Sequence, residues 1–123
     1  MILGIGIDVI QVERIRRWAA IPGLYERYFH PEELEMARRN GPNAVLSLAA
    51  RFAAKEAFGK ALGTGLYGIQ LRDINVVNDP HGKPELVLEG KALEIFRKLG
   101  GKNVHVSLTH EEDYALAMVV LEG

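Results

Sequence analysis

Two acidic residues lie where the side-chain pattern indicates chemistry rather than solvent contact. Asp8 ends the run GIGID, and strand periodicity places it on one face with Gly4 and Gly6, which leave open space beside it. Glu56 lies in RFAAKEAFGKALGTG, where helical spacing places it on a stripe with one aromatic residue and two glycines. Two carboxylates, with water and a substrate phosphate as the remaining ligands, are a usual arrangement for Mg²⁺ in proteins.

Each acid also has a purely structural interpretation. Asp8 could cap a helix that begins directly after it, and Glu56 could form an ion pair with Lys60, one turn further along the same helix. For either acid alone, the structural interpretation explains the sequence as well as a metal site does. Lys60 has a functional alternative too, because a lysine beside a metal ligand can contact the same phosphates as a point charge.

Composition restricts the class of protein. The chain has 123 residues and a formal net charge of −1, which suits one domain (1–123) and provides no overall field for nucleic acid or anionic lipid. It has no cysteine, which excludes disulfides and thiolate catalysis. No apolar run reaches the ~20 residues that span a bilayer, and the start lacks the features of a signal peptide. We expect a cytoplasmic protein that binds neither nucleic acid nor membranes.

Periodicity and turn residues predict the elements that position these acids. In chain order we expect a strand, three helices, one long helix, two strands, a helix and two strands, over residues 2–10, 12–20, 21–29, 30–40, 44–62, 71–79, 84–90, 91–99, 103–111 and 114–122. Helices and strands are largely segregated, which predicts an α+β fold with an antiparallel sheet packed against a long helix. In the first strand, we expect the face of Leu3, Ile5, Ile7 and Val9 to meet the core, with Asp8 on the other face.

Three segments carry a family resemblance. GIGIDVIQVERI, RFAAKEAFGKALGTG and VHVSLTHEEDYALAMVV, with GKP at 82–84, resemble the signature segments of the holo-acyl-carrier-protein synthases, the small class of 4′-phosphopantetheinyl transferases. The resemblance covers essentially the whole chain, and the KExxxK pattern that begins at Lys55 is specific in combination with GIGxD. It implies the transferase fold as a homotrimer, with the coenzyme A site between neighbouring subunits.

The resemblance also implies a reaction. The phosphopantetheine arm of coenzyme A passes to a serine of apo-acyl carrier protein in support of fatty-acid biosynthesis, and adenosine 3′,5′-bisphosphate leaves. Asp8 and Glu56 are implied as ligands of Mg²⁺, with Mn²⁺ possible, and Lys60 as a contact of the phosphates. The serine proton leaves through a metal-bound water or a nearby carboxylate, and the sequence does not decide between them.

A second set of residues is implied for coenzyme A. It comprises Arg51, Gly63, Gly65, Gly82, Lys83, Pro84, Ser107, Thr109 and His110. Without the resemblance, these residues are explained as a solvated helix face, a helix end, a turn and the end of a strand. The neighbouring Lys55 has the same two explanations as Arg51, a phosphate contact or a solvated helix face.

Arginines in ERIRRW form a candidate docking surface. Exposed arginines are ordinarily just solvated, but an acidic helical carrier would favour a local basic patch on a near-neutral protein. Helical spacing predicts that Arg14 and Arg17 share a face, with Arg16 on another side. The resemblance implies that this helix contacts the carrier, so Arg14 and Arg17 are the expected carrier-binding residues.

Two other functions are compatible with the sequence. One is a metal-dependent phosphohydrolase or nucleotide transferase that uses Asp8 and Glu56 on another substrate. The other is a non-catalytic trimeric coenzyme A-binding module, in which Asp8 is a cap and Glu56 an ion-pair partner.

Overall fold

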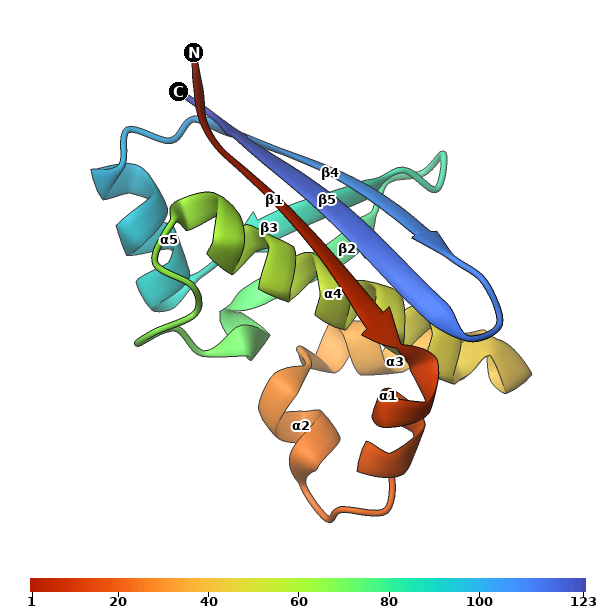
Figure 1. The fold of residues 1–123 in the computed structure, drawn as a ribbon. Helices are drawn as coiled ribbons and strands as arrows, with labels where there is room; N and C mark the ends of the chain where they lie inside the picture. Colours follow the sequence, from red (N-terminus) through yellow and green to blue (C-terminus); the bar gives the residue numbers. More distant parts are fainter.

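The computed structural model describes residues 1–123 and has an α+β fold (Figure 1). Its elements are β1 (Ile2–Gln11), α1 (Val12–Trp18), α2 (Leu24–Tyr28), α3 (Pro31–Arg39), the 3₁₀ turn η1 (Gly41–Asn43), α4 (Ala44–Leu62), the 3₁₀ turn η2 (Leu71–Asp73), β2 (Ile74–Asn78), β3 (Pro84–Leu88), α5 (Gly90–Lys98), β4 (Asn103–His110) and β5 (Tyr114–Glu122). This order confirms the predicted succession of elements.

The strands form two antiparallel sheets instead of one. β1, β5 and β4 pair in the order β1-β5-β4, and β2 and β3 form a separate hairpin. The strand expected over 71–79 begins only at Ile74, because residues 71–73 form η2. In Figure 1 the long helix α4 runs behind the three-stranded sheet, with α1, α2 and α3 gathered at one end of it.

The prediction of which face of β1 meets the core is wrong. Ile5, Ile7 and Val9 are more than half exposed, whereas the face of Gly4 and Gly6 lies against α4. A Cβ at Gly4 would collide with the carbonyl oxygen of Ala61, and one at Gly6 with that of Ala57. These glycines therefore do not leave empty space beside Asp8. They let β1 approach the α4 backbone, and Asp8 shares the face that meets the helix.

Small side chains along α4 make this approach possible. The helix carries buried alanines at 49, 50, 53, 54, 57 and 61, and it is enclosed on several sides by β1, β5, α3 and β2. Its C-terminus is closed by Gly63, whose φ of 83° is easily reached only by glycine. The segment predicted to hold Glu56 is thus the buried central helix of the fold.

The helices at one end are fixed by local hydrogen bonds. His30 caps α3. The His30 ring accepts a hydrogen bond from the backbone N–H of Glu32, and the backbone N–H of His30 donates to the side chain of Glu33. Pro31 occupies the first turn, as its position in the sequence predicts. The Tyr25 hydroxyl donates to the carbonyl oxygen of Ile15 at 2.7 Å and joins α2 to α1.

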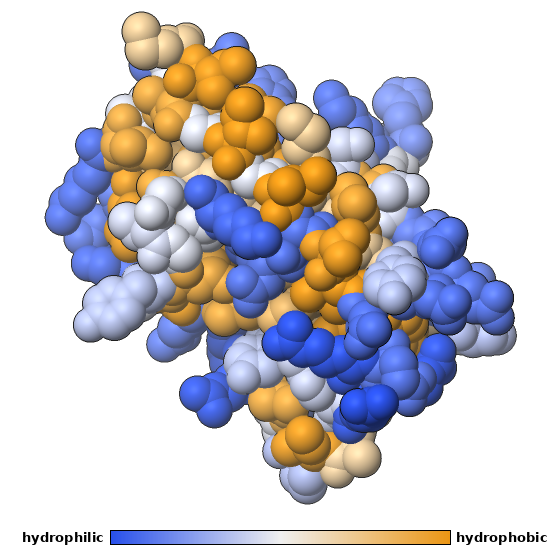
Figure 2. Space-filling model, in the orientation of Figure 1, coloured by the Kyte–Doolittle hydropathy of each residue, from blue (hydrophilic) through white to orange (hydrophobic).

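The other face of the three-stranded sheet is open. Apolar side chains gather along the diagonal that β1 and β5 occupy in Figure 1 (Figure 2). Ile5, Ile7 and Val9 of β1 and Met118 of β5 belong to this face and are exposed. Single exposed apolar residues are ordinary, but a contiguous row indicates a surface that meets a partner. None of the helices combines the length and hydropathy needed to cross a membrane.

Candidate active site

The three residues predicted to act on a metal and phosphate lie together between β1 and α4. Lys60 Nζ lies 2.9 Å from Asp8 Oδ1 and also donates to the carbonyl oxygen of Ile7 at 2.9 Å. Glu56, one turn before Lys60, is close enough for the charge of Asp8 to affect its ionisation. Asp8 and Lys60 are 52 positions apart in the sequence, so they meet only because the chain folds β1 against α4.

Both structural interpretations of the acids are wrong. The residue at the N-cap of α1 is Gln11, three positions after Asp8, so Asp8 does not cap that helix. Lys60 pairs with Asp8 instead of Glu56, and the Glu56 side chain makes no hydrogen bond or ion pair with another residue. Neither carboxylate therefore has the structural role that the sequence suggested, a helix cap for Asp8 and an ion pair with Lys60 for Glu56.

The environment of Glu56 opposes its charge. Burial raises the pKa of Glu56 above its ordinary value, and the neighbouring carboxylate of Asp8 raises it further. Arg14 and Lys60 act in the opposite direction, but they do not cancel the upward shift. A site with two acids so close together favours either a proton or a bound cation.

The donor set fits a hard divalent cation. Asp8 Oδ2 is buried without a hydrogen-bond partner, and Glu56 is unpaired. No cluster of three or more His, Cys, Asp or Glu side chains is present, so protein atoms alone would not complete a coordination shell. Two carboxylate ligands with the remaining positions open to water and phosphate match the preference of Mg²⁺.

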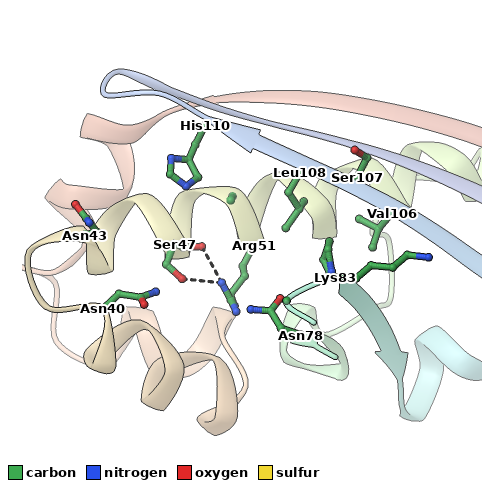
Figure 3. Close-up of a pocket in the computed structure, with 13 residues that line it drawn as sticks. Asn40, Asn43, Ser47, Arg51, Asn78, Lys83, Val106, Ser107, Leu108 and His110 are labelled. Atoms are coloured by element: carbon green, nitrogen blue, oxygen red, sulfur yellow. Dashed lines mark hydrogen bonds between the residues drawn. The ribbon is translucent and has the colours of Figure 1, made fainter. Parts of the chain in front are cut away.

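A second predicted group lines a cavity of about 590 Å³ beside the N-terminal half of α4 (Figure 3). Six residues expected to bind coenzyme A are in its lining, namely Arg51, Gly82, Lys83, Pro84, Ser107 and His110. They come from α4, the turn between β2 and β3, and the end of β4. The structure thus brings together three segments that are far apart in the sequence.

Arg51 is the buried cation of this cavity. It is 5% exposed, and its Nη1 donates to the hydroxyl of Ser47 at 2.6 Å, while its buried Nε has no partner. Burial lowers the pKa of Arg51 from its ordinary value, and the charge of Glu33 partly opposes that shift. An arginine with unused donors on a cavity wall is suited to bind an anionic group.

Gly82 and Lys83 belong to a well-formed turn. Asp79 Oδ1 accepts the backbone N–H groups of His81 and Lys83 at 2.8 and 2.9 Å, and the Gly82 N–H donates to the Asp79 carbonyl oxygen. Gly82 has a φ of 85°, which explains glycine at this position. The turn interpretation of this segment is therefore correct, and the same turn lines the cavity. In Figure 3 the Lys83 side chain extends away from the other labelled side chains.

Three of the residues expected to bind coenzyme A lie elsewhere. Gly63 and Gly65 follow the C-terminus of α4, at the opposite end of the helix from Ser47 and Arg51. Thr109 does not line the cavity. His110 pairs with the buried Ala115, whereas Thr109 pairs with Leu116 on the open face of the sheet. Strand alternation divides the SLTH segment between the two faces, which the grouping by sequence ignored.

Lys55 is neither a phosphate contact nor part of a solvated face. Its side chain is completely buried and forms an ion pair with Glu33 at 2.7 Å. Burial lowers the pKa of Lys55 from its ordinary value, while Glu33 acts in the opposite direction. Both interpretations offered by the sequence are therefore wrong.

The α1 arginines divide in an unexpected way. The Arg14 guanidinium lies over the rings of Trp18 and Phe52, at 5.3 and 5.6 Å from their centroids. Arg16 and Arg17 instead both contact Glu13, at 3.1 and 4.0 Å. Arg14 and Arg17, which the sequence predicts to share a face, therefore make contacts with different residues. Phe52 precedes Glu56 by one helical turn, so Arg14 links α1 to the carboxylate site.

The sequence prediction missed four polar residues of the cavity, namely Asn40, Asn43, Ser47 and Asn78. Ser47 precedes Arg51 by four residues on a helix, so helical spacing alone places it beside that arginine. The asparagines follow α3, precede α4 and end β2, and their polarity is equally typical of any turn.

Comparison with known proteins defines the class. A family model described as the 4′-phosphopantetheinyl transferase superfamily matches residues 4–119. The chain belongs to this superfamily. It is 54% identical over 123 residues to a holo-[acyl-carrier-protein] synthase of Treponema denticola, with all of both chains covered. A synthase of the same description from Trichlorobacter lovleyi is 49% identical over 126 residues, covering 100% of this chain and 99% of the relative.

Solved structures agree with this assignment. A holo-[acyl-carrier-protein] synthase from Neisseria meningitidis has a TM-score of 0.89 at 42% identity, with 100% of both chains covered. One from Bacillus anthracis in complex with CoA (3′,5′-ADP) has a TM-score of 0.81 at 37% identity, covering 98% of this chain and 96% of that one. One from Helicobacter pylori in complex with coenzyme A has a TM-score of 0.83 at 27% identity, covering 96% and 99%.

Proposed function

We propose that this protein transfers the 4′-phosphopantetheine arm of coenzyme A to a serine of apo-acyl carrier protein, releasing adenosine 3′,5′-bisphosphate. The observation that carries this proposal is that the Asp8–Glu56–Lys60 site and the Arg51 cavity both lie beside the central helix of a transferase fold. The curated relatives are holo-[acyl-carrier-protein] synthases, and related structures hold coenzyme A. A role in fatty-acid biosynthesis, a single transferase domain over 1–123 and a cytoplasmic location stay predictions.

In this proposal Asp8 and Glu56 hold Mg²⁺, or Mn²⁺ in its place. The ion, when bound, neutralises charge on the pyrophosphate and on the leaving nucleotide. Lys60 is more than half exposed, so it can keep one donor on Asp8 and offer another to a phosphate oxygen. The buried Arg51 holds the anionic end of the nucleotide in the cavity, where the 79–83 turn forms the facing wall.

We propose a homotrimer in which neighbouring subunits complete the site. Thr109 lies on the open sheet face, and Ser107 of the same strand face also borders the cavity. Gly63 and Gly65 lie at the far end of α4 from the cavity. If one chain supplies the carboxylate side and its neighbour the cavity side, these separated residues can meet at one ligand. The exposed row on β1 and β5 supplies the apolar area for such an interface.

We propose α1 as the docking site of the carrier. Arg14 stacks on Trp18 beside the stripe that leads to Glu56, so an acidic partner bound there would present its serine near the carboxylates. Arg17 has a side chain that is 78% exposed and weakly paired, which leaves it available to the same partner.

Product analysis tests the proposal against both alternatives. The protein is incubated with coenzyme A and Mg²⁺, with and without apo-carrier, and adenosine 3′,5′-bisphosphate is quantified by chromatography. The transferase releases the nucleotide only when the apo-carrier is present. Release without carrier would favour the phosphohydrolase or nucleotide transferase, and coenzyme A binding without any release would favour the binding module.

A further inference from the structure

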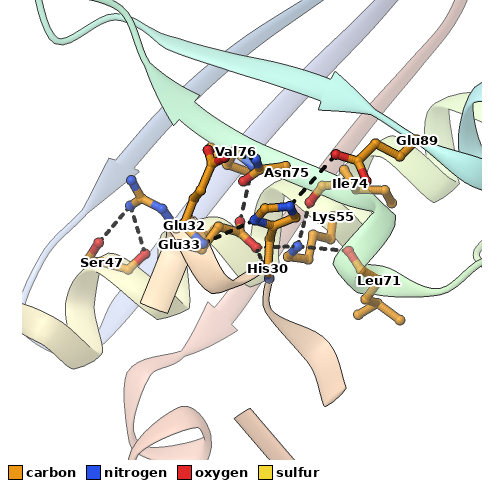
Figure 4. Close-up of polar contacts among 11 residues, drawn as sticks. His30, Glu32, Glu33, Ser47, Lys55, Leu71, Ile74, Asn75, Val76 and Glu89 are labelled. Atoms are coloured by element: carbon orange, nitrogen blue, oxygen red, sulfur yellow. Dashed lines mark hydrogen bonds and ion pairs between the residues drawn. The ribbon is translucent and has the colours of Figure 1, made fainter. Parts of the chain in front are cut away.

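A completely buried ion pair occupies the space between α3, α4 and the β2–β3 hairpin (Figure 4). Lys55 Nζ lies 2.7 Å from Glu33 Oε1, and both side chains are 0% exposed. Lys55 also donates to the carbonyl oxygen of Leu71 at 2.8 Å and to that of Ile74. All three protons of the ammonium group therefore have an acceptor, and two of these acceptors belong to the segment that leads into the hairpin.

Glu33 completes the connection from the other side. Its Oε2 accepts the backbone N–H of Val76 in β2 at 3.2 Å, and its Oε1 also accepts the N–H of His30. One buried pair thus connects α3 and α4 to η2 and β2. The neighbouring Glu32–Asn75 contact, at 3.2 Å, adds a weaker side-chain link between α3 and β2.

The buried pair supplies hydrogen bonds that hold β2 against α3 and α4, while apolar side chains of β2 and β3 pack into the core and β3 lies beside β4. β2 and β3 form a sheet of their own, and no backbone hydrogen bond joins them to the three-stranded sheet. The turn that connects the two strands supplies Gly82 and Lys83 to one wall of the cavity, while α4 supplies Ser47 and Arg51 to the other. The distance between the two walls therefore depends in part on how β2 is held against α4.

Stability alone is a poor explanation for this pair. Removing two charges from water carries a large desolvation cost, and well-packed apolar residues of similar volume often stabilise a fold as well or better. A buried pair with every donor matched does, however, fix geometry, because each displaced hydrogen bond leaves an unpaired charge in the interior.

We propose that the Glu33–Lys55 pair is a positioning device for the nucleotide cavity, which holds the β2–β3 hairpin at the separation from α4 that the ligand requires. Neither residue touches the ligand. The identity of that ligand, the adenosine 3′,5′-bisphosphate part of coenzyme A, rests on the proposed function.

The test replaces the pair with apolar residues of similar length in the double variant Glu33→Met/Lys55→Met. Titration calorimetry with adenosine 3′,5′-bisphosphate measures nucleotide affinity, and Tm and sedimentation report the fold and assembly. We expect Tm to stay close to that of the wild type. Nucleotide affinity should fall at least about tenfold, because the hairpin is no longer held at its position relative to α4. The Michaelis constant for the carrier should be unchanged. The matched control, Glu94→Met/Lys98→Met, removes an exposed pair on α5 and should bind nucleotide like the wild type.

Wild-type nucleotide affinity in a folded double variant would overturn the positioning role and leave the proposed function intact. Wild-type protein that binds no nucleotide would instead remove the proposed function, and this inference with it. Should the double variant not fold, Glu33→Gln replaces it, because glutamine keeps the shape and an acceptor for Val76 N–H but removes the charge facing Lys55. A fall in its affinity at preserved Tm supports the proposal, and unchanged affinity overturns it.

Discussion

The surroundings of Asp8 and Glu56 disfavour two negative charges when no cation is bound. Asp8 has one oxygen on Lys60 and one buried without a partner, and Glu56 has no partner at all. Residues selected only for stability would be paired or exposed. This environment fits the proposed site for a hard cation, and it predicts how variants of the two acids should behave.

Asp8→Asn and Glu56→Gln should each lower turnover by roughly a hundredfold or more, because in the proposed mechanism each removes a charged ligand that stabilises the transition state. Steady-state transfer assays at saturating Mg²⁺ measure the effect, and circular dichroism checks the fold. The exposed Glu94→Gln is the control and should keep wild-type turnover. Near-full activity in both site variants would show that these acids are not the ligands.

Glu56→Gln should also stabilise the metal-free protein near neutral pH. The pKa of Glu56 is raised in the folded state, so the contribution of its protonated form is present below the ordinary value of about 4.5 and is lost as pH rises through the folded pKa. A neutral glutamine avoids that loss. The Tm difference between variant and wild type, measured in chelator, should therefore be small near pH 4 and positive at pH 7.

Glu94→Gln is a control of opposite sign for this stability effect, because its hydrogen bond with Lys98 lowers the pKa of Glu94. That variant should not gain Tm as pH rises. A Tm difference for Glu56→Gln that stays flat across this range would mean that the site does not oppose ionisation of Glu56.

At the scale of elements, the sequence predicted the type and order of helices and strands, because their periodicity and end residues are local signals. It failed where a tertiary contact reverses a local expectation. Ile5 and Ile7 have the composition of a core face, yet the glycines of β1 take that face because α4 comes too close for a Cβ. Lys55 has the polarity of a surface residue, and its partner Glu33 is 22 positions away.

The candidate site was predictable to the same degree. Asp8, Glu56 and Lys60 meet as expected because each lies on a regular element. The SLTH segment was treated as one group, but strand alternation sends Thr109 and His110 to opposite faces. Asn40 and Asn78 were missed because an asparagine in a turn has an ordinary structural explanation.

The α1 helix provides a prediction about docking. Arg14→Glu should raise the Michaelis constant for the carrier most. Arg17→Glu should raise it less, and Arg16→Glu should raise it least. The effect should shrink as salt increases, because exposed charges are screened within ~8–10 Å at 0.1–0.15 M. Coenzyme A affinity should not change in any of the three. Arg97→Glu, an exposed arginine of α5, is the control for charge reversal alone.

Separate titrations of each variant with coenzyme A and with apo-carrier distinguish the two binding events. Loss of coenzyme A affinity in Arg14→Glu, or wild-type behaviour of all three variants, would show that α1 is not the docking surface.

At the scale of the whole molecule, the open sheet face predicts assembly. Ile7 is 56% exposed at the middle of β1, and Ile7→Glu would place a carboxylate in the proposed interface of every subunit. Analytical ultracentrifugation should show the wild type as a trimer and this variant as a monomer. Val87→Glu, at an exposed apolar position of β3, is the control and should remain trimeric. A wild type that sediments as a monomer would contradict the proposed shared site.

Transfer of the phosphopantetheine arm is the central claim, and intact-mass spectrometry of the carrier measures it directly. Apo-carrier is incubated with coenzyme A, Mg²⁺ and either the wild type or Glu56→Gln at equal concentration. We expect the wild type to add the mass of one phosphopantetheine group per carrier, with the variant leaving almost all carrier unmodified over the same time. A carrier whose mass does not change in the presence of the wild type would contradict the proposed function.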